Sequence, residues 1–112
     1  MKHDLDLVRK ILFAVEEFPP DPDWSPLHIE GYDDKVVGEH VRILAEAGFI
    51  EMKDASTFAS AEYWPTALTW QGSQFLEAIR SDSAWANAKR FASETVRMSF
   101  PVLLTELMQR IT

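Results

Sequence analysis

The sequence predicts a single α+β domain in which several helices accompany one short β-hairpin. The stretch from Gly31 to Ile50 has the pattern of an aspartate-capped amphipathic helix that stops at Gly48 and continues directly as a strand. Two strand-like runs, 49–53 and 63–68, flank a loop of small residues, which is the pattern of a hairpin. The chain of 112 residues, 46% of them hydrophobic, is long and apolar enough for one compact domain.

The first predicted helix covers residues 4–18 and ends at a proline-rich loop. Its apolar stripe consists of Leu5, Val8, Leu12 and Val15, widened by Ile11 and Phe18. Pro19 and Pro20 stop the helix, because proline lacks the backbone N–H and restricts the residue before it. After the loop at 19–26, a short strand is expected over 27–30.

The central helix and the hairpin after it carry the clearest local signals. Asp33 or Asp34 can accept hydrogen bonds from the free N–H groups of the first helical turn. The apolar stripe of this helix is Val37, Val41 and Leu44. Ile50 and Met52 are expected on one face of the first strand, and Pro65 indicates an edge position or a bulge in the second. The residues expected on one face of the second strand are Trp64, Thr66 and Leu68.

Three further helices are predicted after the hairpin. Thr69 is expected to cap the first, whose clustered apolar residues are Phe75, Leu76 and Ile79. The second is expected over 83–95, and Ser99 is expected to cap the last. The pattern indicates a core at about 1–81 with a C-terminal helical extension at 82–112.

The last helix has an apolar face that such a core would not need. This face consists of Leu103, Leu104, Leu107, Met108 and Ile111. We expect it to be buried against a second copy, as the interface of a homodimer. The competing interpretation is that the helix folds back on the first helix within one chain, against Leu5, Val8 and Leu12.

Composition restricts the functions that the chain can have. It contains no cysteine, which excludes a disulfide framework and any thiolate site. Its 11 basic and 18 acidic residues give a net charge of −7, which disfavours nucleic acid and favours a protein partner. No apolar run reaches the length of a membrane span and no signal-peptide core is present, so we expect a cytoplasmic protein.

No catalytic, metal-binding or cofactor-binding pattern is found in the sequence. None of His3, His28 and His40 has another histidine at the spacing of a helical metal site. We expect His40 to be partly buried and to hydrogen-bond nearby backbone. The paired carboxylates sit at predicted helix ends and in a loop, and the four glycines are isolated. We therefore expect no enzymatic activity, no metal and no cofactor.

Two phrases resemble parts of a winged helix-turn-helix domain. HVRILAEAGFI is similar to its last helix and first wing strand, and LTWQGSQFL to its closing phrase. The separate second helix of such a domain is missing or reduced to a turn here. The candidate contacts to nucleic acid or to a partner are Lys35, Glu39, Arg42 and Lys53. Carboxylates lie among them and the wing tip carries no Lys or Arg, so a packing scaffold has equal weight with DNA binding.

Longer phrases resemble one family over nearly the whole chain. They are MKHDLDLVRKIL, IEGYD, EHVRILAEAGFI and PTALTWQGSQFLEAIRSDSAW, in this order. They are similar to family two-five-one-three of the domain-of-unknown-function series, small bacterial proteins that prophages often encode. The resemblance implies a winged-helix-like fold and no particular activity.

The function expected from these observations is that of a non-enzymatic binding module of prophage type. DNA-linked regulation is the leading hypothesis. The alternative is a protein-binding adaptor or inhibitor that uses an acidic winged-helix scaffold. The salt dependence of binding to duplex DNA distinguishes the two, because only phosphate contacts release counterions.

Overall fold

The computed structural model describes residues 3–19, 25–94 and 99–111. Within them, five helices and two strands follow each other along the chain. Their bounds are α1 Leu5–Glu16, α2 Asp34–Glu46, β1 Ile50–Asp54, β2 Tyr63–Leu68, α3 Trp70–Ala78, α4 Asp82–Glu94 and α5 Phe100–Ile111. The prediction of a small α+β domain is confirmed.

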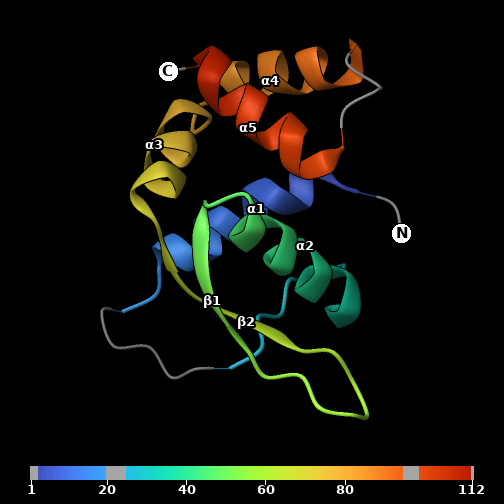
Figure 1. Cartoon of the computed structure of the whole chain (residues 1–112). Helices are drawn as coiled ribbons and strands as arrows, with labels where there is room; N and C mark the ends of the chain where they lie inside the picture. The colour runs from blue at the N-terminus through green and yellow to red at the C-terminus, as the bar shows by residue number, and fades with distance from the viewer. Residues whose placement is uncertain (1–2, 20–24, 95–98, 112) are drawn as a thin grey trace.

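The helices pack around one hydrophobic core, and the hairpin extends away from it (Figure 1). α1 contacts α2, α3 and β2, while α2 contacts both strands. α5 lies across the other end of the domain, against α2, α3 and α4. The largest fully buried apolar side chains are Leu7, Ile11, Leu12, Leu44, Phe75, Leu76, Ile79, Leu104 and Leu107. None of the described helices is long and apolar enough to cross a membrane.

The end of α2 confirms the predicted glycine stop. Asp33 caps the start of the helix, and its side chain accepts a hydrogen bond from a first-turn N–H. Gly48 has a φ of 87°, which places it in the left-handed region. The N–H of Phe49 donates to the carbonyl of Leu44 at 3.0 Å, and that of Gly48 to Ala45 at 3.1 Å. This is the Schellman arrangement, and it turns the chain directly into β1.

β1 and β2 pair antiparallel, as predicted, and the pairing contains a bulge. Ile50 lies opposite Leu68. The register shifts between Glu51 and Met52, which leaves Thr66 without a partner residue on β1. The prediction of an edge or a bulge around the proline of β2 is therefore confirmed.

The face predicted for β2 was wrong because of this bulge. Trp64, Thr66 and Leu68 do not share one face, since an extra residue reverses the alternation of side chains. Pro65 is the buried residue of β2 and lies on the same face as Leu68. Trp64 lies opposite Lys53 on the other face, where it is half-buried.

The strand expected over 27–30 is not present. The segment ends in a turn in which the N–H of Tyr32 donates to the carbonyl of Ile29 at 3.1 Å. Gly31 in this turn has a φ of 87°. Leu27 and Ile29 pack half-buried against the core. Their apolar pattern thus reflects side-chain burial, and no described strand pairs with the segment.

The connection between α1 and α2 does not match a helix-turn-helix. It covers 17–33, whereas the two helices of that motif are joined by a turn of about 3–4 residues. The described part of the connection contains no further helix. A helix that leads directly into a hairpin is the part of the winged-helix pattern that is present.

The expectation that α5 leaves an unused apolar face was wrong. Leu103, Leu104 and Leu107 are buried within the chain, with at most 8% of each exposed. Met108 packs against the same core, and the side chain of Ile111 lies outside the described residues. The helix folds back within its own chain, as the alternative expected, but it packs mainly against α2, α3 and α4 and not against the first helix. The described leucines of this face are buried within their own chain, so they are not available as a dimer interface.

Candidate functional site

An open groove of about 450 Å³ lies between the first half of α2 and the hairpin loop. We call it the α2–hairpin groove. It is lined by Lys35, Val36, Gly38, Glu39, Ala59, Ser60, Ala61 and Tyr63. Most of these side chains are small or apolar. The groove is therefore suited to an apolar group with a few polar contacts at its edge.

The hairpin loop is ordered by its own hydrogen bonds. The N–H of Ala55 donates to the carbonyl of Glu62 at 2.9 Å, and the N–H of Thr57 to Ser60 at 2.9 Å. Phe58 lies at the tip of this loop and is fully exposed. Phe58 is not among the residues that line the groove, but the next three residues of the loop, Ala59, Ser60 and Ala61, are.

Gly38 leaves the backbone of α2 accessible from the groove. A Cβ added at this position would meet no atom within 4 Å. Packing within the described chain therefore does not require glycine here. Glycine inside a helix costs about 1 kcal/mol relative to alanine, so its presence is unfavourable for α2 alone. A group that approaches the helix closely from outside would account for it.

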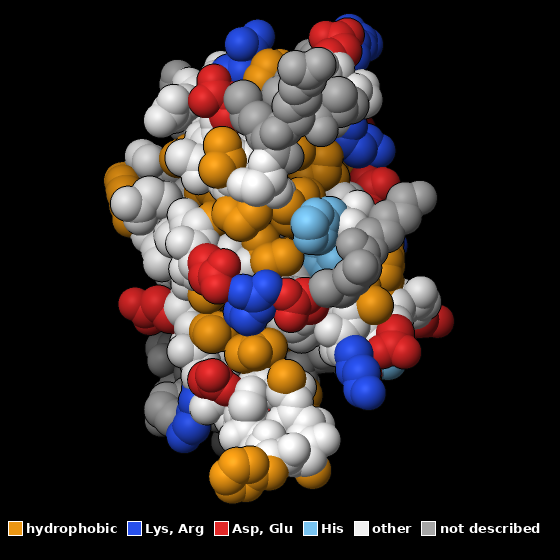
Figure 2. All heavy atoms as spheres, turned by 45° about the vertical axis from the view of Figure 1, so that its right-hand side comes forward, with side chains coloured by type: hydrophobic (Ala, Val, Ile, Leu, Met, Phe, Trp, Pro, Cys, Tyr) orange, Lys and Arg blue, Asp and Glu red, His pale blue; other side chains and the backbone are white. Residues whose placement is uncertain are grey.

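Carboxylates neutralise Arg42, the central basic residue of this face. Its Nε donates to Glu39 at 2.9 Å, and Nη1 pairs with Glu46 at 2.5 Å. The hydrogen bond from Arg42 lowers the pKa of Glu39, and the same bond raises the pKa of Arg42. Figure 2 shows a basic side chain between two acidic ones on this face, with hydrophobic side chains above and below. Arg42, Glu39 and Glu46 together therefore present no net positive charge on this face.

The four predicted contact residues are separated by the structure. Lys35 and Glu39 line the α2–hairpin groove, and Arg42 is tied to Glu39 one turn further along α2. Lys53 lies on β1 opposite Trp64, outside the groove lining. Sequence reasoning missed the apolar part of the site. Two signals could have indicated it, a glycine inside a helical pattern and a single aromatic residue in a small-residue loop.

His40 has a structural role, close to the one predicted. It is fully buried, and its Nδ1 lies 2.8 Å from the carbonyl of Val36. Its Nε2 accepts a hydrogen bond from the N–H of Asp4 at 3.0 Å, so both ring nitrogens are used. Phe100 stacks on His3 and meets His40 edge-on. Burial and the nearby His40 lower the pKa of His3. The described residues contain no group of three or more side chains suited to hold a metal ion.

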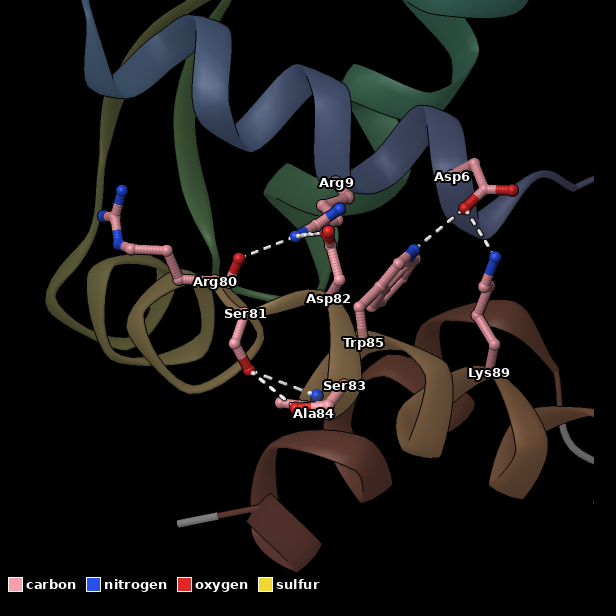
Figure 3. Close-up of polar contacts among 9 residues, drawn as sticks. All are labelled: Asp6, Arg9, Arg80, Ser81, Asp82, Ser83, Ala84, Trp85 and Lys89. Carbon is pink, nitrogen blue, oxygen red and sulfur yellow. Dashed lines mark hydrogen bonds and ion pairs between the residues drawn. The ribbon is translucent and has the colours of Figure 1, made fainter.

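A polar junction joins α1 to the start of α4 (Figure 3). Asp6 accepts a hydrogen bond from Nε1 of Trp85 at 2.8 Å and pairs with Lys89 at 3.1 Å. Arg9 donates to the carbonyl of Arg80 at 2.7 Å. Asp6 and Arg9 lie in the sequence phrase DLDLVRK, and Arg80 and Trp85 lie in AIRSDSAW, so these two phrases meet in space. The polar residues of this junction hold helices together, and none of them lines the α2–hairpin groove.

The fold and this surface define a small α+β domain with an apolar groove between a helix and a hairpin. The chain belongs to the family described as "Hypothetical protein (DUF2513)", whose model matches residues 2–97. A Haemophilus influenzae protein described as uncharacterized is 34% identical over 90 residues, which cover 80% of this chain and 76% of that protein. No solved structure matches the chain. The resemblance to this family that the longer sequence phrases indicated is thereby confirmed.

Proposed function

We propose that the chain is a non-enzymatic module that binds a protein partner through the face formed by α2 and the hairpin loop. The observation that supports this proposal is the largely apolar α2–hairpin groove, whose loop wall also carries the fully exposed Phe58. Aromatic side chains next to small pockets are typical energetic centres of protein interfaces. Leaving Phe58 in water is unfavourable for the isolated chain, and burial by a partner would remove that cost.

The charge of the chain favours a basic partner segment with an apolar anchor. The net charge is −7, and Glu39 lines the groove. Asp34 and Glu62 do not line it but are sequence neighbours of residues that do. A carboxylate-rich surface repels phosphate but attracts Lys and Arg. Complementary charge of this kind would speed association, while the apolar groove would supply most of the affinity.

DNA-linked regulation by a winged-helix protein of prophage type is the second candidate. The observation in its favour is that α2 leads directly into a hairpin, as the last helix of a winged-helix domain leads into the wing. Two observations weigh against it. Arg42 is paired with carboxylates, and residues 55–62 of the hairpin loop contain no Lys or Arg.

A mobility-shift experiment on duplex DNA separates the two candidates. We expect the wild type to show non-specific retention at most, and Lys35→Ala and Arg42→Ala to leave it unchanged at low and moderate salt. Non-specific retention also falls with salt, so the decisive observation is whether either substitution weakens the retention and flattens its salt dependence. A salt-dependent shift that either substitution flattens would favour DNA binding over the protein-binding proposal.

The protein-binding proposal is tested with matched surface variants. Partners captured by the wild type and by the control Trp70→Ser should be lost with Phe58→Ser and with Gly38→Leu. Trp70 is a suitable control because it is a 74% exposed aromatic residue outside the groove lining. For a purified partner, titration calorimetry should show at least about tenfold weaker binding to the two groove variants. Equal binding to all four proteins would contradict the proposal.

A further inference from the structure

Two hydrogen bonds hold the buried ring of His40 in one protonation state. The Nδ1 atom lies 2.8 Å from the carbonyl oxygen of Val36, which can only accept a hydrogen bond, so Nδ1 carries the ring proton. The Nε2 atom accepts a hydrogen bond from the backbone N–H of Asp4 at 3.0 Å, so Nε2 carries none. The side chain is fully buried. The fold therefore requires the neutral ring with its proton on Nδ1.

We propose that His40 is an acid-sensitive latch, whose neutral ring holds the start of α1 against α2 and whose protonation releases it. A proton added to Nε2 would point at the N–H of Asp4, and two donors cannot share one hydrogen bond. Burial acts in the same direction, because a charged imidazolium is costly in an apolar site. Histidine is the side chain that takes up a proton between about pH 5 and pH 8, so the latch responds to mild acid.

Asp4 is the residue that the latch positions. Its carboxylate accepts a hydrogen bond from the N–H of Leu7 at 3.2 Å and caps α1, while its own N–H binds His40. Burial and the charge of Asp4, to which it is hydrogen-bonded, raise the pKa of Tyr32 in the turn before α2. Without the bond to His40, the N–H of Asp4 loses its partner in part-buried surroundings, and segment 3–4 has to move toward water.

A second histidine strengthens the response. The ring of His3 stacks on Phe100 of α5, with ring centroids 4.5 Å apart, and lies edge-on to His40 at 6.1 Å. Burial and the nearby His40 lower the pKa of His3, so the fold also disfavours a charge on this ring. Two protonated rings at this distance repel each other. Movement of His3 would uncover Phe100, which is 6% exposed in the fold.

The charged groups that face His40 are engaged elsewhere. On α2, Glu39 accepts a hydrogen bond from Arg42, which lowers the pKa of Glu39. At the start of α1, the Asp4 carboxylate serves as the helix cap. α5 meets the ring with the uncharged Phe100. Within the described chain the ring bonds only to two backbone groups, so a proton on Nε2 finds no carboxylate in place to receive it.

Nuclear magnetic resonance of the whole chain tests the latch. At about pH 7.5, the ring nitrogens of His40 should report the Nδ1–H form, and the Asp4 amide should be protected from hydrogen exchange. At about pH 5, the protection factor of this amide should fall at least about tenfold, while amides of α3 keep theirs. An Nε2–H form at the higher pH, or an Asp4 amide equally protected at both, would overturn the proposal.

His40→Gln is the matched variant, because its side-chain oxygen can accept the N–H of Asp4 and does not titrate. Its Asp4 amide should keep the same protection factor, within about twofold, at both pH values. His28→Gln is the control, because His28 is exposed, and this variant should respond to acid as the wild type does. An unchanged acid response in His40→Gln would contradict the role of His40. If His40→Gln does not fold, the ring nitrogens and the Asp4 amide of the wild type decide.

Discussion

Thr69 and Gly72 join three elements at one point. The Thr69 hydroxyl accepts a hydrogen bond from the N–H of Gly72 at 3.0 Å and donates to the carbonyl of Gly48 at 2.6 Å. The N–H of Thr69 donates to the carbonyl of Phe49 at 3.1 Å. A Cβ on Gly72 would lie 1.8 Å from that same carbonyl oxygen. The hydrogen bonds of Thr69 therefore hold the start of α3 against the end of α2 and the start of β1. This close approach is possible because Gly72 has no Cβ.

Two glycine substitutions should change stability in opposite directions. Gly72→Ala forces a methyl group against rigid backbone and should lower the free energy of unfolding by about 1–3 kcal/mol or more. Gly38→Ala places its methyl group in open space within a helix and should raise that free energy by about 0.5–1 kcal/mol. Urea unfolding followed by circular dichroism measures both. A loss of stability in Gly38→Ala would mean that the groove position is not open.

At the scale of elements, the Asp6 carboxylate of α1 binds two residues of α4, Trp85 and Lys89. The hydrogen bond from Trp85 lowers the pKa of Asp6, and the bond and charge of Lys89 act in the same direction. The indole of Trp85 is buried, while the Asp6 side chain is about half exposed. The junction thus combines apolar burial of α4 with an ionised group at the start of α1, where the helix dipole also favours negative charge.

Asp6→Asn should make folding stability less dependent on pH. Because the folded-state pKa of Asp6 is below the unfolded one, the carboxylate stabilises the fold at pH values above about 4. This contribution is lost as the pH falls through the lowered folded-state pKa. Solvent screening limits it to less than about 1 kcal/mol at neutral pH.

Urea unfolding of both proteins between pH 3 and pH 6 checks this expectation. The stability difference between wild type and Asp6→Asn should be largest at pH 6 and shrink toward pH 3. A difference that stays constant across this range would show that the charge of Asp6 does not stabilise the fold.

At the scale of the whole molecule, α5 completes the core. Leu104 and Leu107 are fully buried among residues of the other helices, and Phe100 at the start of α5 contacts His40 of α2. Small domains bury a limited fraction of their surface, so an entire apolar helix face contributes substantially to stability. The C-terminal helices therefore belong to the same core as α1, α2 and α3.

Leu107→Ala should destabilise the fold without changing the association state. Replacing a buried leucine by alanine lowers the free energy of unfolding by about 2–5 kcal/mol. Val102→Ala is the matched control on the same helix, because Val102 is 53% exposed and should change stability by less than about 0.5 kcal/mol. Thermal unfolding and light scattering measure the two properties. If Leu107→Ala changed the mass in solution and left the stability unchanged, the result would support the dimer interface that the sequence predicted on the last helix.

The candidate site was predictable only in its polar part. Lys35 and Glu39 were found because charged residues on the outer face of a predicted helix can be identified from helical periodicity. The pairing of Arg42 with both Glu39 and Glu46 depends on rotamers, although their spacing along α2 allows it. The groove itself depends on the distance between α2 and a loop some twenty residues later. No local pattern encodes that distance.

The sequence alone determined the features that depend on near neighbours in the chain. These are the aspartate cap of α2, the stop at Gly48, the hairpin and the cap at Thr69, each of which rests on hydrogen bonds across a few residues. Tertiary structure decided the features in which distant segments compete for the same surface. It placed the apolar face of α5 in the core of its own chain and left the segment at 27–30 without a strand partner. The physical reason is that burial of apolar area has no direction, so a hydrophobic pattern shows that a face is covered but not what covers it.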